Sequence, residues 1–393
     1  MNDKIKNIIQ DCNINFLIGS GLSLPYLKTL GNIEKLLTEL EEKQNMSASK
    51  KKLIRASLYK KYFDDVISKN PKILESDVTA QEVLETYRNF LNILNSILLK
   101  RKVTLLSKEV NLFTTNIDIF LEKALEDLNL EYNDGFNGRF KPKFSLSNFK
   151  KSHFKKSLHY DNTAELPVFN LSKLHGSLSW EITPNDIIFS CELKHVKEVS
   201  SKTISPAHII DIPEDATIAK LITAATGKTT DASTDAFMEA YEKLLIVVNP
   251  TKEKFKHTLM NQTYYELLRL YSNELEKDNT VLFVMGFSFA DEHLKEITLR
   301  AANSNPTLMI YVIAHSSKAK IGIEEKFGKN NIKNNNIEII APEQEVTGDG
   351  SKIDKFEYDF PTINKNIFGC LLEEENVENI VTEEKINNPE AEE

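Results

Sequence analysis

The strongest constraint on the fold is a repeated pattern in which a short apolar run ends in glycine or small polar residues and an amphipathic helical stretch follows. Strands that alternate with helices favour a parallel sheet with helices on both faces. We therefore predict an α/β fold with a Rossmann-like parallel sheet and a helical insertion module. The predicted strands are residues 15–18, 110–113, 168–174, 244–248, 280–285, 308–314 and 337–340.

The pattern also suggests a division of the chain. Residues 1–32 and 104–345 are expected to form the Rossmann-like domain, with 177–243 as an insertion or cap over the sheet. Residues 33–103 form a predicted helical module, because apolar residues recur there at three- and four-residue spacing. This module contains no catalytic constellation, so it serves packing or an interface with another subunit, and we expect a homo-oligomer. Residues 346–393 form a C-terminal extension.

Charge and cysteine content narrow the classes of function. The net charge of −9 is concentrated in residues 373–393, where nine glutamates and one lysine form an acidic tail that we expect to be disordered. Three widely spaced cysteines, Cys12, Cys191 and Cys370, exclude a disulfide framework and a zinc ribbon, so we predict no metal. The first ten residues lack a signal-peptide core, and no apolar run is long enough to span a bilayer. We expect a cytoplasmic protein without membrane contact.

The first candidate site is the turn Gly19-Ser20-Gly21, which follows the strand 15–18. Two glycines permit a tight turn close to a ligand, and a helix beginning near Leu22 would offer N–H groups to a pyrophosphate. Leu24 stands where the dinucleotide fingerprint has its third glycine. An ordinary strand-to-helix turn therefore remains open as an alternative.

Three further strand ends carry polar residues or glycine. Thr115 and Asn116 follow the strand 110–113, and Asp118 lies at the start of a predicted helix over 117–130, where open α/β sheets bind ligands. Helix capping is the alternative for Thr115 and for Asp118. His175 ends the strand 168–174 and suits proton transfer near neutral pH, although a lone histidine is usually structural. Gly286 follows the strand 280–285. We therefore expect the four strand ends, which carry Gly19, Asn116, His175 and Gly286, to lie at the same edge of the sheet.

A basic segment, residues 139–156 from Arg139 to Lys156, contains seven lysines or arginines and no acid, with four phenylalanines interleaved. Basic side chains neutralise phosphates and aromatic rings stack on bases, so this segment is the best candidate for contact with DNA. The alternative is a solvated loop whose phenylalanines anchor it to the body.

Four motifs in order resemble the sirtuin-like NAD-binding domain, in the bacterial defence branch of that superfamily. They are GSGLS at 19–23, TTNID at 114–118, LHG at 174–176 and GFSFADEH at 286–293. The resemblance spans about residues 14–315 and implies NAD+ as substrate. It implies Gly19, Ser20 and Gly21 at the phosphates, Asn116 and His175 in catalysis, Asp118 at the carboxamide, and Gly286 and Ser288 at the adenosine-side ribose. Ser23 and Thr115 complete the nucleotide contacts that we expect.

Departures from the family pattern shape the expected activity. Three cysteines cannot build the family's four-cysteine zinc module, and LPYLKTL at 24–30 replaces its proline–aspartate–phenylalanine–arginine segment. Both differences count against peptide deacylation. The resemblance then implies an NAD+ hydrolase that releases nicotinamide and ADP-ribose in antiphage defence, controlled by a HerA-type hexameric ATPase. The alternatives are a DNA-binding or nuclease subunit, and a non-catalytic sensor of NAD or ADP-ribose.

Overall fold

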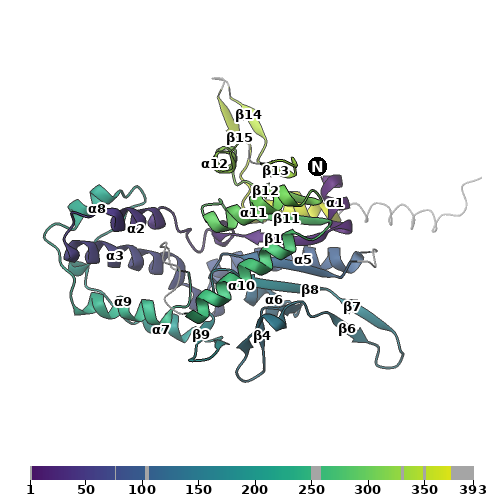
Figure 1. The fold of residues 1–393 in the computed structure, drawn as a ribbon, viewed down its shortest axis with the longest axis horizontal. Helices are drawn as coiled ribbons and strands as arrows, with labels where there is room; N and C mark the ends of the chain where they lie inside the picture. The colour runs from purple at the N-terminus through teal and green to yellow at the C-terminus, as the bar shows by residue number, and fades with distance from the viewer. Residues whose placement is uncertain are drawn as a thin grey trace, which may run out of the picture.

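The centre of the protein is a seven-stranded sheet in the order β13-β12-β11-β1-β2-β8-β3, in which every neighbouring pair is parallel (Figure 1). The computed structural model describes residues 2–75, 77–101, 106–248, 258–328, 332–347 and 351–372, so the predicted acidic tail lies outside it. The α/β prediction is confirmed. The strands are β1 (Asn13–Ile18), β2 (Glu109–Thr114), β3 (Glu131–Asn133), β8 (Val168–Lys173), β11 (Thr280–Met285), β12 (Leu308–Ile313) and β13 (Ile337–Ile340).

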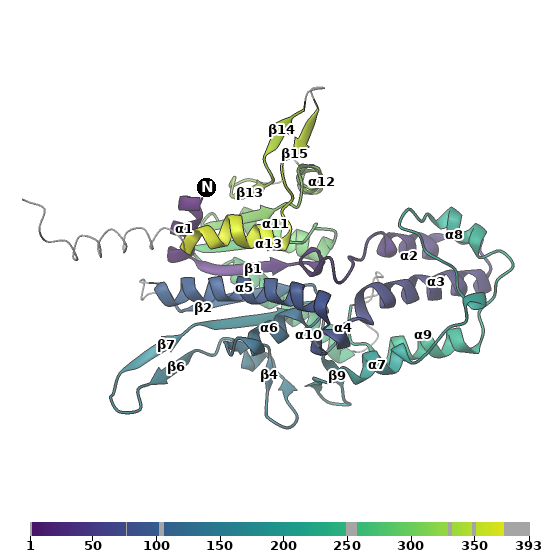
Figure 2. The same cartoon turned by 180° about the vertical axis from the view of Figure 1, so that it is seen from behind.

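Helices cover both faces of this sheet, because successive side chains of a buried strand point to opposite sides. Phe16 of β1 packs on Phe90 and Phe368, whereas Phe113 of β2 packs on Tyr271 on the other face. Figures 1 and 2 show the two faces in turn. The first is covered by α1 (Asn2–Asp11), α5 (Val78–Lys100), α6 (Phe120–Asp127), α13 (Phe360–Ile363) and the π-helix η5 (Asn364–Gly369), the second by α10 (Thr258–Leu275), α11 (Glu292–Ser304) and α12 (Ser317–Phe327).

A helical lobe lies beyond the carboxyl ends of the strands (Figures 1 and 2). Two distant segments build it, as Phe63 shows by packing edge-on against both Phe237 and Tyr241. From the predicted helical module, α5 packs on α6 and, through Phe90 against Phe16 of β1, on the sheet, and it contacts the lobe through α4. The lobe contains α2 (Ile33–Glu42), α3 (Ala48–Tyr62) with the π-helix η2 (Phe63–Ile67), α4 (Asn70–Leu74), α7 (Lys194–Ser200), η4 (Pro206–His208), α8 (Ile218–Ala224) and α9 (Ala232–Leu244).

Two local predictions are wrong. No α-helix begins near Leu22, because Pro25 holds Leu24 in an extended conformation, and only the 3-10 helix η1 (Ser20–Ser23) forms. The predicted strand 244–248 is not a strand, and of its residues only Val247 forms an isolated bridge, with Gly176. β2 pairs with all of β8 and β3 pairs with Val168–Asn170, and the apolar run meets the chain only beyond the end of β8, at Gly176.

Smaller strands project from the body. The four-stranded sheet contains β4 (Phe136–Asn137), β5 (Lys143–Phe144), β9 (Trp180–Ile182) and β10 (Ile187–Phe189), and the 3-10 helix η3 (Leu146–Asn148) follows β5. Two antiparallel hairpins are β6 (His153–Lys156) with β7 (Thr163–Leu166), and β14 (Gln344–Val346) with β15 (Lys352–Asp354). Across the described ranges, no helix combines the length and the apolar character needed to cross a membrane.

Candidate functional site

The four predicted strand ends share the carboxyl edge of the sheet. Thr114 of β2 is in register with Lys173 of β8, and two residues beyond this pair stand Asn116 and His175. Ile18 of β1 is likewise in register with Met285 of β11, and one residue beyond this pair stand Gly19 and Gly286. The next strand of this sheet along the chain, β2, pairs with one side of β1, whereas β11 pairs with the other side of β1. This is the topological switch point where open α/β sheets bind ligands.

The two glycines of the first turn pack against the turn after β11. Gly19 N–H donates to the carbonyl of Met285 at 2.9 Å, and Gly21 N–H donates to the carbonyl of Gly286 at 3.0 Å. A Cβ on Gly19 would lie 2.4 Å from the Gly286 oxygen, so a side chain there is excluded. These glycines are therefore needed for the contact between two turns, and their N–H groups are engaged. Contact of Gly19, Ser20 and Gly21 with phosphate stays a prediction.

A buried hydrogen-bond network joins four side chains beside this turn. The carboxylate of Asp118 only accepts, so the Ser23 hydroxyl donates to its Oδ2 at 2.7 Å. The Ser23 oxygen then accepts from the Tyr87 hydroxyl at 3.0 Å and from Asn116 Nδ2 at 3.3 Å. These donor and acceptor roles fix the orientation of the Asn116 amide, because its Nδ2 must face Ser23. Its buried Oδ1 has no hydrogen-bond partner in the part of the chain that the structure describes.

Tyr87 and Asp118 support this network from two elements. Burial, reinforced by the nearby Asp118 carboxylate, raises the pKa of Tyr87 well above its ordinary value, so Tyr87 keeps its proton. Asp118 Oδ1 also accepts from Phe120 N–H at 3.2 Å, at the first residue of α6. This bond spans two residues, as in an Asx turn, whereas the N-cap residue of α6 is Ile119, whose side chain makes no capping hydrogen bond. The N–H of Thr115 donates to the Ile18 carbonyl at 3.1 Å, and its contact with nucleotide stays a prediction.

His175 is paired with a carboxylate that lies within the fourth motif but was not among the expected site residues. Its Nε2 lies 3.2 Å from Asp291 Oδ2, and both side chains are largely buried. Asp291 Oδ1 accepts from Leu294 N–H at 3.1 Å, capping α11. The backbone carbonyl of His175 accepts from Val248 N–H at 2.9 Å. Both the ring and the backbone of His175 are therefore held in place.

A buried ion pair fixes the end of β8 beneath His175. Lys173 Nζ lies 3.2 Å from Glu122 Oε2 and also donates to the backbone carbonyl of Asp118. Ser177 donates to Glu122 Oε1 at 2.9 Å. A buried pair tolerates little movement, because removing either partner leaves an uncompensated charge. This pair holds the segment with His175 and the segment with Asp118 in a fixed relation.

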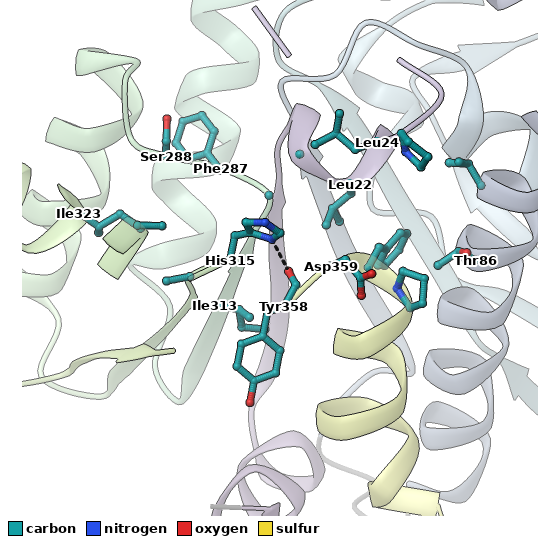
Figure 3. Close-up of a pocket in the computed structure, with 18 of the residues that line it drawn as sticks. Leu22, Leu24, Thr86, Phe287, Ser288, Ile313, His315, Ile323, Tyr358 and Asp359 are labelled. Atoms are coloured by element: carbon teal, nitrogen blue, oxygen red, sulfur yellow. Dashed lines mark hydrogen bonds between the residues drawn. The ribbon is translucent and has the colours of Figure 1, made fainter. Parts of the chain in front are cut away.

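A cavity of about 740 Å³ opens at the ends of β1, β11 and β12 (Figure 3). Three predicted residues line it, namely Gly21, Gly286 and Ser288. Its wall includes Lys326, whose Nζ donates to the Ser288 carbonyl at 2.7 Å. Burial, together with the charge of Lys295, lowers the pKa of Lys326. Asn116 and His175 do not line this cavity; they belong to the neighbouring polar network and histidine pair.

Several site residues were missed by sequence reasoning. Asp291 directly precedes a helical stretch, and an acid in that position is an N-cap signal that could have identified it. Tyr87 lies 64 residues from Ser23 in an unbroken helix, and no local pattern links the two. Lys173 and Glu122 likewise meet only through the tertiary fold. Among the described residues, no three His, Cys, Asp or Glu side chains cluster as metal ligands would.

Comparison with known proteins finds no protein-family model that matches the chain and no curated protein that matches it. Fold and site therefore define the class of the molecule. It is a Rossmann-like α/β protein with a polar network, a histidine–aspartate pair and a cavity along the carboxyl edge of its sheet.

Proposed function

We propose that the protein is an NAD+ hydrolase that cleaves the nicotinamide–ribose bond to give nicotinamide and ADP-ribose. The observation that carries this proposal is the buried, unpartnered Oδ1 of Asn116, on the same sheet edge as the His175–Asp291 pair. Buried acceptors almost always have a donor, so a water or a ligand hydroxyl is the expected partner. A histidine held by a carboxylate is suited to accept the proton that such a reaction releases.

The cavity supports the placement of the adenosine half of the nucleotide. Its volume of about 740 Å³ lies in the range of small-ligand pockets. Gly286 and Ser288 on its wall would lie at the adenosine-side ribose, and the diphosphate would cross the switch point beside Ser20. The nicotinamide ribose would then extend toward Asn116 and His175. Each oxygen of Asp118 keeps a further lone pair for the carboxamide N–H.

In the proposed reaction the C1′–N bond breaks with its electron pair leaving on nicotinamide, and a water oxygen bonds to C1′. Asn116 Oδ1 accepts from the water or a ribose hydroxyl and orients it. With Nε2–H directed at Asp291, Nδ1 of His175 takes the proton. Asp291 keeps the ring in that orientation. The balance is NAD+ plus water to nicotinamide, ADP-ribose and a proton.

The cellular role proposed here rests on the resemblance of the four motifs to the defence branch of the sirtuin-like family. An enzyme that depletes NAD harms its own cell, so its activity requires control by another component. The proposed partner is a HerA-type hexameric ATPase. The protein itself would act as a homo-oligomer in the cytoplasm, and the proposed process is antiphage defence.

Nicotinamide release from NAD+ by the purified chain tests the proposal, with and without the ATPase and DNA. Release should collapse in Asn116→Ala and His175→Ala. It should persist in His293→Ala, because this exposed histidine of the same motif lies outside the site. Absence of nicotinamide under every condition would refute the hydrolase. Calorimetric binding of NAD+ without turnover, insensitive to His175→Ala, would instead favour the sensor.

A further inference from the structure

Two hairpins, β4–β5 and β6–β7, project from the margin of the molecule that carries β8 and β3 (Figures 1 and 2). They expose large apolar side chains: Phe140 is 104% exposed, Leu158 94%, Tyr160 73% and Phe154 65%. Single exposed apolar residues are common on proteins, but four of them on two hairpins that project from the same margin require an explanation. Their side chains make no contribution to the core of this domain.

The same stretch is strongly basic in an otherwise acidic chain. Residues 136–166 contain seven lysines and arginines against two acids, a net charge of +5, while the whole chain carries −9. The structure divides these cations into two groups. Lys143, Lys150 and Lys151 have internal partners, respectively Asp186 at 2.7 Å, Glu274 at 2.9 Å and Asn148 Oδ1 at 2.7 Å.

The other four cations, Arg139, Lys141, Lys155 and Lys156, are exposed on the two hairpins. Lys156 reaches Asp161 at 2.8 Å, but both side chains are mostly in solvent, so this pair contributes little and can exchange for another anion. Arg139 and Lys141 flank Phe140, and Lys155 follows Phe154. Each hairpin therefore presents an aromatic ring between or beside cations.

The segment between the two hairpins packs on the body of the protein, and this holds the hairpins in place. Phe149 is buried, and Lys150 Nζ also contacts Asn111 Oδ1 at 3.2 Å on β2. At the start of β6, His153 Nδ1 lies 3.0 Å from Glu131 Oε2 on the edge strand β3. The anchoring alternative from the sequence therefore holds for Phe149, whereas Phe140 and Phe154 point to solvent.

We propose that these two hairpins, Phe136–Phe144 and His153–Leu166, bind single-stranded nucleic acid. The four exposed cations would contact phosphates, and the rings of Phe140, Phe154 and Tyr160 would stack on bases. Stacking favours a single strand, because the bases of a duplex do not offer their faces. Phe154 and Lys156 share one face of β6 while Lys155 lies on the other, so cations occur on both faces rather than framing one apolar face for a membrane. This binding is independent of the proposed NAD+ chemistry.

Fluorescence anisotropy with a labelled oligothymidylate of about 20 nucleotides tests the proposal on the full chain at increasing salt. The wild type should bind, with affinity falling as salt rises. Replacing Arg139, Lys141, Lys155 and Lys156 by glutamine should weaken binding and reduce the salt slope by about 0.7 for each phosphate that the variant no longer neutralises. Replacing Phe140, Phe154 and Tyr160 by alanine should weaken binding about fivefold or more for each base unstacked, with the slope unchanged.

The β14–β15 hairpin supplies a matched control. It also projects into solvent (Figure 1), with Val346 68% and Ile353 46% exposed, but it has no basic excess. The double variant Val346→Ala, Lys352→Gln should bind like the wild type. Because all replaced side chains are exposed, every variant should retain the wild-type melting temperature, which separates weakened binding from misfolding.

Four outcomes would overturn the proposal. The first two are a wild type that does not bind at low salt, and hairpin variants that bind as the wild type does. The third is binding to phosphatidylserine vesicles without binding to the oligonucleotide. The fourth is equal binding of duplex with no effect of the aromatic replacements, which would refute stacking on a single strand. Nicotinamide release is measured in parallel without nucleic acid, so that failure of the proposed hydrolase can be distinguished from failure of the proposed nucleic-acid binding.

Discussion

At the scale of single residues, the direction of each hydrogen bond decides what the site can do. Asp118 only accepts, so Ser23 donates to it, and the remaining lone pairs of Ser23 are filled by Tyr87 and Asn116. The amide oxygen of Asn116 is then the one acceptor in this network without a partner among the described residues. A buried network with one unfilled acceptor is rigid before a ligand arrives, which is what positioning of a reacting group requires.

Asp291 is the residue whose charge should matter most to His175. Asp291→Asn keeps an Oδ1 to cap α11 through Leu294 N–H but removes the charge that faces the imidazole. We expect kcat for nicotinamide release to fall roughly tenfold to a hundredfold with KM little changed, a part of what a positioned base contributes. Steady-state kinetics on the wild type and the variant measure this.

Asp231 provides the control for that substitution. Asp231 lies in the helical lobe, where it caps α9 through Thr234 N–H at 3.1 Å, and its Oδ2 lies 3.7 Å from His208 Nε2. Like Asp291, it therefore combines a helix cap with a histidine contact. Asp231→Asn should leave kcat unchanged. An equal loss in both variants would mean that capping or stability, rather than the orientation of His175, explains the effect.

Asp134 should make stability depend on pH. Burial raises its pKa to about 6, with Glu122 adding to the effect, against about 3.9 in an unfolded chain. The folded carboxyl keeps its proton longer, so the free energy of unfolding falls as pH rises from about 4 through 6. Asp134→Asn retains an acceptor for Phe136 N–H and should stabilise the protein at pH 8 by about 1 to 3 kcal/mol, with little effect near pH 4. Urea unfolding at both pH values checks this, and an equal difference at the two would contradict it.

At the scale of elements, a ladder of asparagines fixes the register of half the sheet. Asn15, Asn111, Asn170 and Asn133 are in register on β1, β2, β8 and β3. From the second asparagine on, each Nδ2 donates to Oδ1 of the asparagine before it, at 2.8 to 2.9 Å. A slip of one residue would move each asparagine to the opposite face and break the ladder. Because the register is fixed here, the ends of β2 and β8 stay level and Asn116 and His175 remain at equivalent positions.

Local pattern was sufficient for most elements and failed where distant residues decide. The apolar runs over β1, β2, β8, β11, β12 and β13 predicted real strands. The first five are buried on both faces, whereas β13 at the edge of the sheet is only partly buried. The run 244–248 is also apolar, but tertiary packing brings it to the chain only beyond the end of β8, at Gly176, which no local pattern reveals. The sequence shows the asparagines inside four of the strands, but it does not predict that they align in register.

The contact between the turns after β1 and β11 gives a stability prediction. A Cβ on Gly19 would lie 2.4 Å from the backbone oxygen of Gly286, which cannot move aside as a side chain would. Gly19→Ala should lower the free energy of unfolding by about 1 to 3 kcal/mol. Gly322, within α12, has open space around its Cβ position, so Gly322→Ala should raise stability by about 0.5 to 1 kcal/mol. Chemical denaturation measures both, and effects of the same sign would contradict the packing argument.

At the scale of the whole molecule, the site exists only when distant segments meet. The four strand ends could be predicted to share an edge, because all strands of a parallel sheet end together. Tyr87 and Asp291 could not be assigned, since each reaches its partner through tertiary packing, across 64 and 116 residues. The cavity has the same character, because its walls come from η1, α5, α12 and the ends of β11 and β12.

Filling that cavity tests whether it holds the adenosine half of the nucleotide. ADP-ribose at a hundred times its Kd should stabilise the wild type by about 2.7 kcal/mol and raise its melting temperature. Thr86 lines the cavity from α5, and its hydroxyl donates within its own helix, to the Glu82 carbonyl at 3.1 Å. Thr86→Trp should therefore abolish the shift, whereas Asn92→Trp, at an exposed position on the same helix, should not. A full shift in Thr86→Trp would place ADP-ribose outside this cavity.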